Sequence, residues 1–320
     1  MFLPDAATMS RRDWNTLIEN PSRQELRTWL APPYPSINHN IARQIHHDGS
    51  ATWFIQSESF QEWKKNGSLL WICGKRTRVL SVLPSPSTNP SASQRARERA
   101  FFGTLFPSCS SYIKFILSIS STIIEDIKHT QEARSALIAY YYFDSRDVAK
   151  HDRRGLLSSL LTQLCDESDR CWDVLSQLYS ACGAGSEQPS EAAQARCLRR
   201  MLALPGQVPI FIIVDALDEC PNTTGTPSPR EKVLNLVEDL VLSEHSNLHI
   251  CVTSRPEHDI QTILDPLAPR RVSLHDEGGQ REDIMNYIRS FVNRDRAMRR
   301  WRVEDKELVI SMLSERANGM

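Results

Sequence analysis

The chain lacks several features that would assign a protein to a class at once. No stretch of its 320 residues reaches the roughly 18 consecutive apolar residues that a membrane span requires, and its N-terminus has no charged-then-apolar signal segment. Its 38 basic and 39 acidic residues give a formal net charge of -1, which offers no overall attraction to nucleic acid or to acidic membranes. These absences predict a cytoplasmic protein, with a nuclear address as the alternative, and no membrane or nucleic-acid partner.

Signatures of metal-binding, hydrolytic and repeat proteins are also missing. The eight cysteines include no CxxC pair, so we expect reduced thiols, mostly in the core, rather than a disulfide scaffold or a zinc knuckle. No GxSxG elbow occurs, which argues against a Ser/His/Asp hydrolase. No internal repeat of about 30–45 residues is present, so we expect no repeat-built sensor array.

Apolar runs alternate with helical segments along most of the chain. Runs typical of strands occur at 68–74, 136–144, 209–214, 248–256 and 270–274. Segments with a helical pattern occur at 9–30, 60–65, 120–129, 156–165, 172–182, 191–204, 231–242, 280–292 and 303–318. This alternation predicts an α/β fold with a doubly wound, mostly parallel sheet, flanked by helices and preceded by a short helical segment.

One of the predicted strands ends in a group of acids. The run at 209–214 leads into Asp215, which is followed after two apolar residues by Asp218 and Glu219. The near-continuous apolar character of this run is that of a strand buried on both faces. Carboxylates where such a strand emerges are well placed to hold Mg²⁺ or to orient a water, as an aspartate does in P-loop NTPases. Taken alone, the pattern also fits an aspartate that caps the next turn.

The following strand, at 248–256, also ends in polar side chains. These are Thr253, Ser254 and Arg255. Folds of this kind bind ligands at the carboxyl edge of the sheet, where an arginine could sense the terminal phosphate of a nucleotide. A strand-end turn broken by Pro256 is the alternative. Two polar strand ends in one α/β pattern favour a nucleotide-switch ancestry more than either does alone.

These motifs give the chain a resemblance to a known family. The segments AYYYFD, GLLSSLLTQLC, FIIVDALDEC, LHICVTSRPEHDI and REDIMNYI, in this order, are similar to the NACHT-type module of fungal NOD-like receptors, which are P-loop NTPases of the STAND class. The lead-in segments WLAPPYPSINHN, ATWFIQSESFQEWKK and SLLWICGK are similar too, and the type is the nephrocystin 3-like N-terminal domain. The resemblance covers nearly the whole chain except 76–117.

The resemblance implies a function and a set of site residues. The family's module binds ATP or GTP with Mg²⁺, and it signals through protein partners or by forming oligomers of itself. By resemblance, Asp215 is the magnesium-side acid and Arg255 is the sensor. Asp218 and Glu219 are the acidic pair that follows the first acid.

The sequence departs from the family at the phosphate-binding loop. That loop reads Gly, four residues, then Gly-Lys-Ser/Thr; its amides cradle the phosphates, its lysine reaches the β and γ phosphates and its hydroxyl ligates Mg²⁺. Gly74 and Lys75 match the first two positions, as a remnant of the loop. Val79 and Leu80 stand where the second glycine and the lysine belong, and Ser81 falls on the hydroxyl position by chance.

The missing groups decide how strongly a nucleotide can bind. Each charge-assisted hydrogen bond to a phosphate contributes roughly 1.5–3 kcal/mol. Losing the lysine and several amides removes on the order of 5 kcal/mol or more, about the difference between micromolar and worse than millimolar binding. We therefore expect this chain to bind ATP poorly and to be inactive as an NTPase, although its family is enzymatic.

A stretch of different character, 76–117, separates the loop remnant from the next helix. It contains the Pro/Ser-rich LPSPSTNPSAS and the basic QRARER, and we expect disorder. Strand-to-helix loops in such units usually have about 2–6 residues. We interpret the stretch as translated intron, with a real insertion in a decayed paralogue as the alternative. The resemblance then divides the chain into a helical lead-in with a proline-rich linker (1–50), an interrupted NTPase domain (51–293) and the start of a truncated helical domain (294–320).

Two functions compete on these observations. The first is an NTP-dependent signalling switch, closed with ADP and opened and oligomerised by ATP. Asp215 and Arg255 favour it, and the absent lysine loop opposes it. The second is a non-catalytic interaction module, a pseudo-NTPase that holds protein partners through its helical faces. The amphipathic helices and the missing C-terminal half favour this second function.

Overall fold

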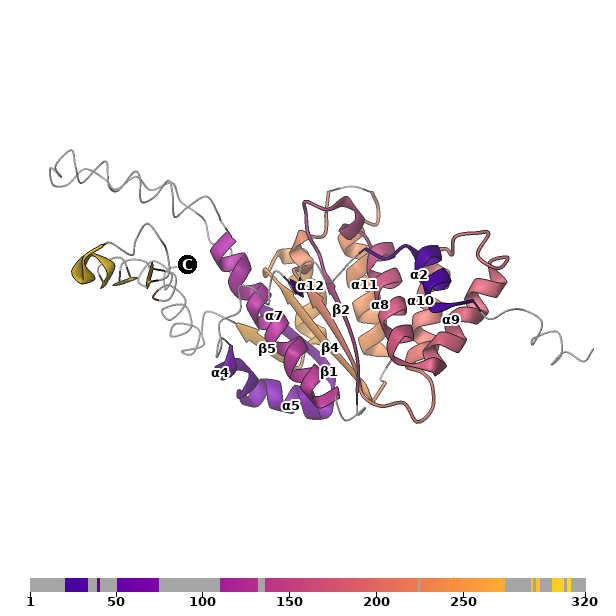
Figure 1. Ribbon diagram of the computed structural model, residues 1–320, viewed down its shortest axis with the longest axis horizontal. Helices are drawn as coiled ribbons and strands as arrows, with labels where there is room; N and C mark the ends of the chain where they lie inside the picture. Colours follow the sequence, from indigo (N-terminus) through magenta and orange to yellow (C-terminus); the bar gives the residue numbers. More distant parts are fainter. Residues whose placement is uncertain are drawn as a thin grey trace, which may run out of the picture.

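The structure, a computed structural model, describes residues 21–33, 39–40, 51–74, 110–131, 136–223, 225–243 and 245–273, and short pieces between 289 and 311 (Figure 1). Its centre is a sheet of the strands β1 (Ser68–Cys73), β2 (Leu137–Tyr142), β3 (Ile210–Asp215), β4 (Leu248–Ser254) and β5 (Arg270–Ser273). Their order is β2-β3-β4-β1-β5, and every pairing among them is parallel. The predicted α/β fold is confirmed, and the arrangement is consistent with a P-loop NTPase-like fold.

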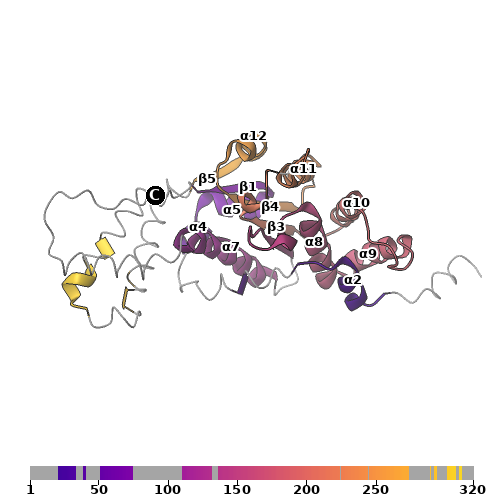
Figure 2. The same cartoon turned by 90° about the horizontal axis from the view of Figure 1, so that it is seen from above.

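Helices cover both faces of this sheet (Figure 2). One face carries α4 (Thr52–Ile55), α5 (Glu58–Asn66) and α7 (Ser110–Gln131). The other carries α8 (Arg153–Glu167), α9 (Asp169–Ala181), α10 (Glu191–Leu202), α11 (Pro229–Leu242) and α12 (His258–Leu267), with α2 (Arg23–Leu30) packed outside them. The short 3₁₀ helices η1 (Val148–Lys150) and η2 (Leu217–Glu219) follow β2 and β3.

The side chains of β3 show how the sheet separates two apolar layers. Phe211 and Ile213 pack in the cluster that contains α7, whereas Ile212 and Val214 pack in the cluster that contains α8. Every residue of β3 is buried, which is why its sequence is continuously apolar up to its last position. Because successive residues point to opposite faces, Asp215 at the end of β3 faces α7.

The helix expected at 120–129 is longer than its prediction. α7 begins at Ser110, so the end of the stretch 76–117 continues into it without a break. The sequence from 110 to 131 contains neither proline nor glycine, so no residue stops the helix from extending toward its N-terminus. Residues 110–117 are part of α7, while 76–109 lies outside the described residues, so the expected disorder of this stretch stays a prediction.

Two helices are absent from the sequence prediction. α4 has only four residues. α12 buries just Ile260 and Leu264 and contains Pro266, so its apolar period is too short to identify it. The helices predicted at 280–292 and 303–318 fall mostly outside the described residues, although 303–307 is helical.

The expectation of reduced cysteines is confirmed for the part of the chain that the structure describes. All seven cysteines in it are free, and all but Cys182 are buried. Burial raises the pKa of the Cys197 thiol to about 12, so this thiol is protonated at neutral pH. Within the same residues, no helix combines the length and the apolar character needed to cross a bilayer.

β2 is an edge strand of the sheet, and α8 shields its free side. Glu167 accepts the N–H of Ile138 at 2.9 Å. Gln163 accepts the N–H of Tyr140 at 3.1 Å and donates to the Tyr140 carbonyl at 2.8 Å. Unpaired backbone groups on a sheet edge can pair with another chain. Two side chains one helical turn apart therefore close this edge to strand addition.

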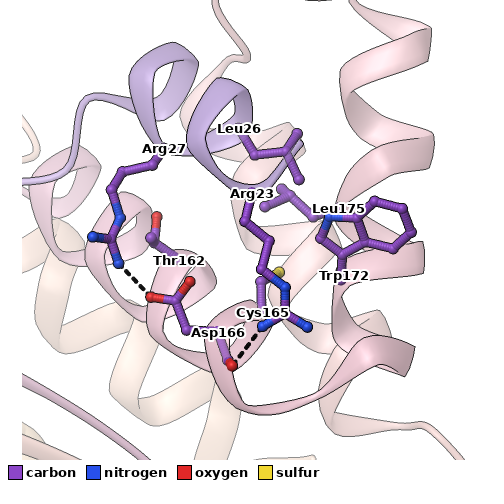
Figure 3. A pocket seen from close by; sticks show the side chains of 8 residues that line it. All are labelled: Arg23, Leu26, Arg27, Thr162, Cys165, Asp166, Trp172 and Leu175. Carbon is purple, nitrogen blue, oxygen red and sulfur yellow. Dashed lines mark hydrogen bonds and ion pairs between the residues drawn. The ribbon is translucent and has the colours of Figure 1, made fainter. Parts of the chain in front are cut away.

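The helix α2, which is the short helical segment expected before the sheet, is docked on α8 and α9 (Figure 3). The α2 side chains Leu26 and Trp29 are buried where this helix contacts α8 and α9. Arg23 donates to the carbonyl of Asp166 at 2.6 Å, and Arg27 bonds to the carboxylate of the same residue. The cavity left between these helices measures about 10 Å³, which is room for about one water. It is a gap in the packing rather than a ligand site.

Candidate functional site

The carboxyl ends of β3 and β4 lie side by side, and three elements meet there on one carboxylate. Oδ1 of Asp215 accepts a hydrogen bond from the hydroxyl of Thr253 in β4 at 2.7 Å. The same oxygen accepts a second hydrogen bond from the hydroxyl of Ser120 in α7. The Thr253 hydroxyl oxygen also accepts the N–H of Ala216 at 3.0 Å, so the group is anchored to the backbone after β3.

The ionised carboxyl group of Asp215 destabilises the fold, because it is buried. It is 1% exposed, and its second oxygen, Oδ2, has no hydrogen-bond partner among the described residues. Burial raises the pKa of Asp215 from 3.8 to about 6, although the hydrogen bonds from Ser120 and Thr253 act in the opposite direction. Carboxyl groups with such raised pKa values concentrate at functional sites, because a purely structural position would favour a neutral residue.

The lead-in segment reaches the same region through His39. Its imidazole is buried, with Nδ1 3.1 Å from the Tyr142 hydroxyl and Nε2 3.0 Å from the Glu125 carboxylate of α7. Tyr142 is the register partner of Asp215 in the β2–β3 pair. Burial and the nearby Asp215 raise the pKa of Tyr142, so the phenol stays protonated and can donate to Nδ1. His39 thus ties the lead-in to β2, which pairs with β3 beside Asp215, and to α7.

Asp218 and Arg255 form the second part of the site. Oδ1 of Asp218 accepts the backbone N–H of Arg255 at 2.9 Å, and Oδ2 lies 3.2 Å from Nε of the Arg255 side chain. The Asp218 side chain is 6% exposed and that of Arg255 is 29% exposed. Burial raises the pKa of Asp218, although its contacts with Arg255 lower it. The arginine expected to sense a phosphate is therefore engaged by an acid.

Glu219 is directed to a third partner. Its carboxylate accepts the N–H of Ser145, in the segment after β2, at 2.9 Å. Burial raises the pKa of Glu219 as well. The three predicted acids thus gather at one edge of the sheet but bond to different elements. Asp215 is joined to β4 through Thr253, and Asp218 is joined to it through Arg255.

The loop remnant begins beside the same strand ends. Gly74, the residue after β1, is buried and donates its N–H to the Ser254 carbonyl at 3.3 Å. It extends the β1–β4 ladder by one residue, which places the start of the remnant next to Arg255. Lys75 and the following positions through Ser81 lie outside the described residues.

The donor atoms around Asp215 suit Mg²⁺ in part. Carboxylate and hydroxyl oxygens are the hard donors that Mg²⁺ prefers, and this ion commonly uses one or two carboxylates together with substrate phosphates. Oδ2 of Asp215 is buried and has no hydrogen-bond partner among the described residues, and Ser120 and Thr253 bond to the other oxygen, Oδ1. Among the described residues, no three His, Cys, Asp or Glu side chains form a metal-binding group. The site fits a Mg²⁺ ion that arrives with a phosphate, not an ion held by protein alone.

Two residues that lie near the carboxyl ends of β3 and β4, Ser120 and Arg230, are not identified from the sequence. Ser120 lies within the run SISST of α7, and the repeated hydroxyls of this run are the signal that could reveal it. Arg230 stands in the first turn of α11, where a positive charge opposes the helix dipole. It is also only 5% exposed, so a cation at this position requires partners inside the protein.

A cavity of about 580 Å³ lies at the other end of the strands. It is lined by residues at the start of β2, before β3 and at the α8–α9 junction, including Leu137, Gln207 and Arg170. The strands enter the sheet at this end, whereas Asp215 and Arg255 lie where they leave it. The cavity is therefore separate from the candidate site.

Comparison with protein families gives a match over the middle of the chain. Residues 118–255 match the family described as Nephrocystin 3, N-terminal. The matched segment runs from α7 through β2 and β3 to Arg255, so it contains Asp215 but neither β1 nor Gly74. The match supports a nephrocystin 3-like N-terminal domain and confirms that part of the resemblance. A search among curated proteins found no match to the chain.

Proposed function

We propose that the chain is a NACHT-type signalling module built on a P-loop NTPase-like scaffold, which works through protein contacts with little or no nucleotide turnover. In this proposal the metal-side acid and the sensor arginine of a nucleotide switch are retained. The phosphate anchor between them is not. The partner is another protein or a second copy of the chain, bound through the helical faces.

The contact between Asp215 and Ser120 is the observation that carries the proposal. It joins the end of β3 to α7, the next helix after β1 among the described residues, and a phosphate-binding loop leads from a strand into a helix. P-loop NTPases use a hydroxyl at the end of the loop and an aspartate from a neighbouring strand around Mg²⁺. Ser120 lies inside α7, so its contact with Asp215 pairs the same kinds of group but not the loop hydroxyl itself. The buried Oδ2 of Asp215 supports this assignment, because it is the one oxygen of the carboxylate without a hydrogen-bond partner among the described residues.

The described residues have separate roles in such a site. With a nucleotide bound, Mg²⁺ would neutralise part of the phosphate charge. Asp215 is ionised above its pKa of about 6 and would present Oδ2, while Ser120 and Thr253 orient the carboxylate through Oδ1. Arg255 would have to exchange Asp218 for a phosphate oxygen before it could act as a sensor.

Two features make nucleotide binding weak in this chain. The absent lysine and loop amides remove on the order of 5 kcal/mol. In addition, Asp218 already neutralises Arg255, and Asp215 and Glu219 add further negative charge at the same edge, which opposes a triphosphate. The helical faces then remain as the means by which the module acts.

A second candidate, a working nucleotide switch made from a different transcript, is favoured by one observation. The family match begins at residue 118, directly after the stretch 76–117 that we interpret as intron. Removal of this stretch with a shifted splice would replace the loop. Sequencing transcripts across residues 70–125 tests the idea, and reads that run through the stretch as the dominant species would exclude it.

The oligomeric state of the purified chain tests the proposed function. Size-exclusion chromatography with light scattering is run without nucleotide, with ADP and Mg²⁺, and with ATP and Mg²⁺. We expect the same molar mass in all three conditions, because nucleotide cannot drive assembly without its phosphate anchor. Assembly that appears only with ATP would contradict the proposal and support the nucleotide switch.

A further inference from the structure

A buried arginine stands between the two loops that carry Asp218 and Arg255. Arg230 lies in the first turn of α11, and its side chain is 7% exposed. A buried guanidinium destabilises a fold unless its donors are bonded and its charge is paired. The hydrogen-bond and ion-pair partners of the Arg230 guanidinium therefore show why an arginine is stable at this position.

One side of the guanidinium bonds to the turn after β3. Nε donates to the carbonyl of Cys220 at 2.9 Å, and Nη2 donates to the carbonyl of Asp218 at 2.6 Å. Both carbonyls belong to η2 or follow it directly. Arg230 thus holds the backbone of the residue whose side chain bonds to Arg255.

The other side of the guanidinium faces the segment after β4. Nη1 donates to the Glu257 carboxylate at 2.5 Å and lies 3.2 Å from Oδ2 of Asp259. Glu257 is the N-cap of α12 and stands two residues after Arg255. One side chain therefore bonds to both of the loops that meet at the candidate site.

We propose that Arg230 is a positioning residue that clamps the turn after β3 to the segment after β4 and so fixes the Asp218–Arg255 pair. The meaning of that pair as acid and sensor rests on the proposed function. The clamp itself is a property of the chain without ligand. Among the described residues, the other bonds that link these two loops are those between Asp218 and Arg255 themselves and an exposed contact between Asn222 and Asp259.

The fork shape of the guanidinium is essential to the clamp. Arginine presents a planar set of donors and can bond two carbonyls and two carboxylates at once. A lysine at the same position can face Glu257 and Asp259, but its single ammonium cannot reach both carbonyls as well. Arg230→Lys therefore separates the role of the charge from the role of the fork.

Hydrogen exchange of the Arg255 amide, which bonds to Asp218, is the measurement that tests the clamp. It is followed by NMR in the absence of nucleotide for the wild-type chain, Arg230→Gln and Arg230→Lys. Arg199→Gln is the matched control, since Arg199 pairs with Asp239 at the surface. We expect the Arg255 amide to exchange about 10- to 100-fold faster in both Arg230 variants, as for loss of a bond to a charged group, and to be unchanged in the control.

The pattern of exchange separates positioning from general stability. Faster exchange confined to the two loops supports the clamp. An equal increase at the core amides of β3 and β4 would reduce Arg230 to a structural residue and overturn the proposal, as would full protection in Arg230→Lys. If Arg230→Gln does not fold, Glu257→Gln tests the clamp from its other side and should give the same local increase. No nucleotide is present, so failure of the proposed function does not change this result.

Discussion

Asp215→Asn should gain stability relative to wild type as the pH rises from acid to neutral, although it removes the acid at the centre of the candidate site. Burial raises the pKa of Asp215 from 3.8 to about 6. A difference of about two pH units between the unfolded and folded states corresponds to roughly 3 kcal/mol. This free energy is the penalty of ionising a carboxyl group in a dry position, and an asparagine does not incur it.

The sign of the effect follows from proton linkage. Between pH 3.8 and about 6, the folded state keeps the proton on Asp215 and the unfolded state has lost it, so the stability from this group falls as the pH rises. Above pH 6 both states are ionised and the full penalty is present. The stability of Asp215→Asn relative to wild type should therefore increase by about 3 kcal/mol between pH 4 and pH 7.5, which is about 5–10 °C in melting temperature.

The unfolding free energies of Asp215→Asn and wild type must be compared over a range of pH rather than at one pH. Asparagine keeps an oxygen for the hydroxyls of Ser120 and Thr253 but places an NH₂ group at Oδ2, which adds a penalty of about 1–3 kcal/mol at every pH. Urea unfolding of both proteins at several pH values separates the two effects, because this penalty is the same at every pH and only the contribution of the Asp215 carboxyl group changes. Asp144→Asn is the control, because the hydrogen bond from Arg146 lowers the pKa of Asp144. That variant should lose stability at neutral pH and approach wild type in acid.

A difference between Asp215→Asn and wild type that does not change from pH 4 to pH 7.5 would refute the reasoning. It would mean that the Asp215 carboxyl group titrates as it does in water. The site would then be more open than its 1% exposure indicates.

Three further variants test neighbouring contacts. Ser120→Ala should raise the pKa of Asp215 further, since the hydrogen bond from Ser120 lowers it; a carboxyl ¹³C titration would show this, and an unchanged midpoint would contradict the contact. Gln163→Ala should destabilise the fold by about 1–3 kcal/mol in urea unfolding, because it leaves the edge groups of Tyr140 unpaired. Trp29→Phe should lower stability by about 0.5–1.5 kcal/mol, since the indole N–H bonds to the loop after α9, and a neutral effect would argue against docking of α2.

The sheet and the location of the site could be predicted because both follow from simple patterns. Strands buried on both faces have continuously apolar sequences, and the carboxyl ends of parallel strands meet at one edge. Asp215 and Arg255 could therefore be assigned to the same edge from the sequence. The bond between Thr253 and Asp215 follows from the same placement.

The partners of the other acids could not be predicted, because they depend on the shape of a turn. Ala216 adopts a φ of 55° in the left-handed region, which non-glycine residues rarely adopt. This conformation turns the chain into η2 and directs Asp218 toward Arg255. Hydrophobic periodicity carries no information about such a turn, nor about Arg230, whose partners come from two separate loops.

Isothermal titration of the full chain with ATP in the presence of Mg²⁺ tests the central claim most directly. The claim is that the acid and arginine of a nucleotide switch remain while the phosphate anchor is lost. It predicts no measurable heat, corresponding to a Kd weaker than about 1 mM. Saturable binding in the micromolar range, abolished by Asp215→Asn, would show that the chain holds a nucleotide without that loop and would contradict the claim.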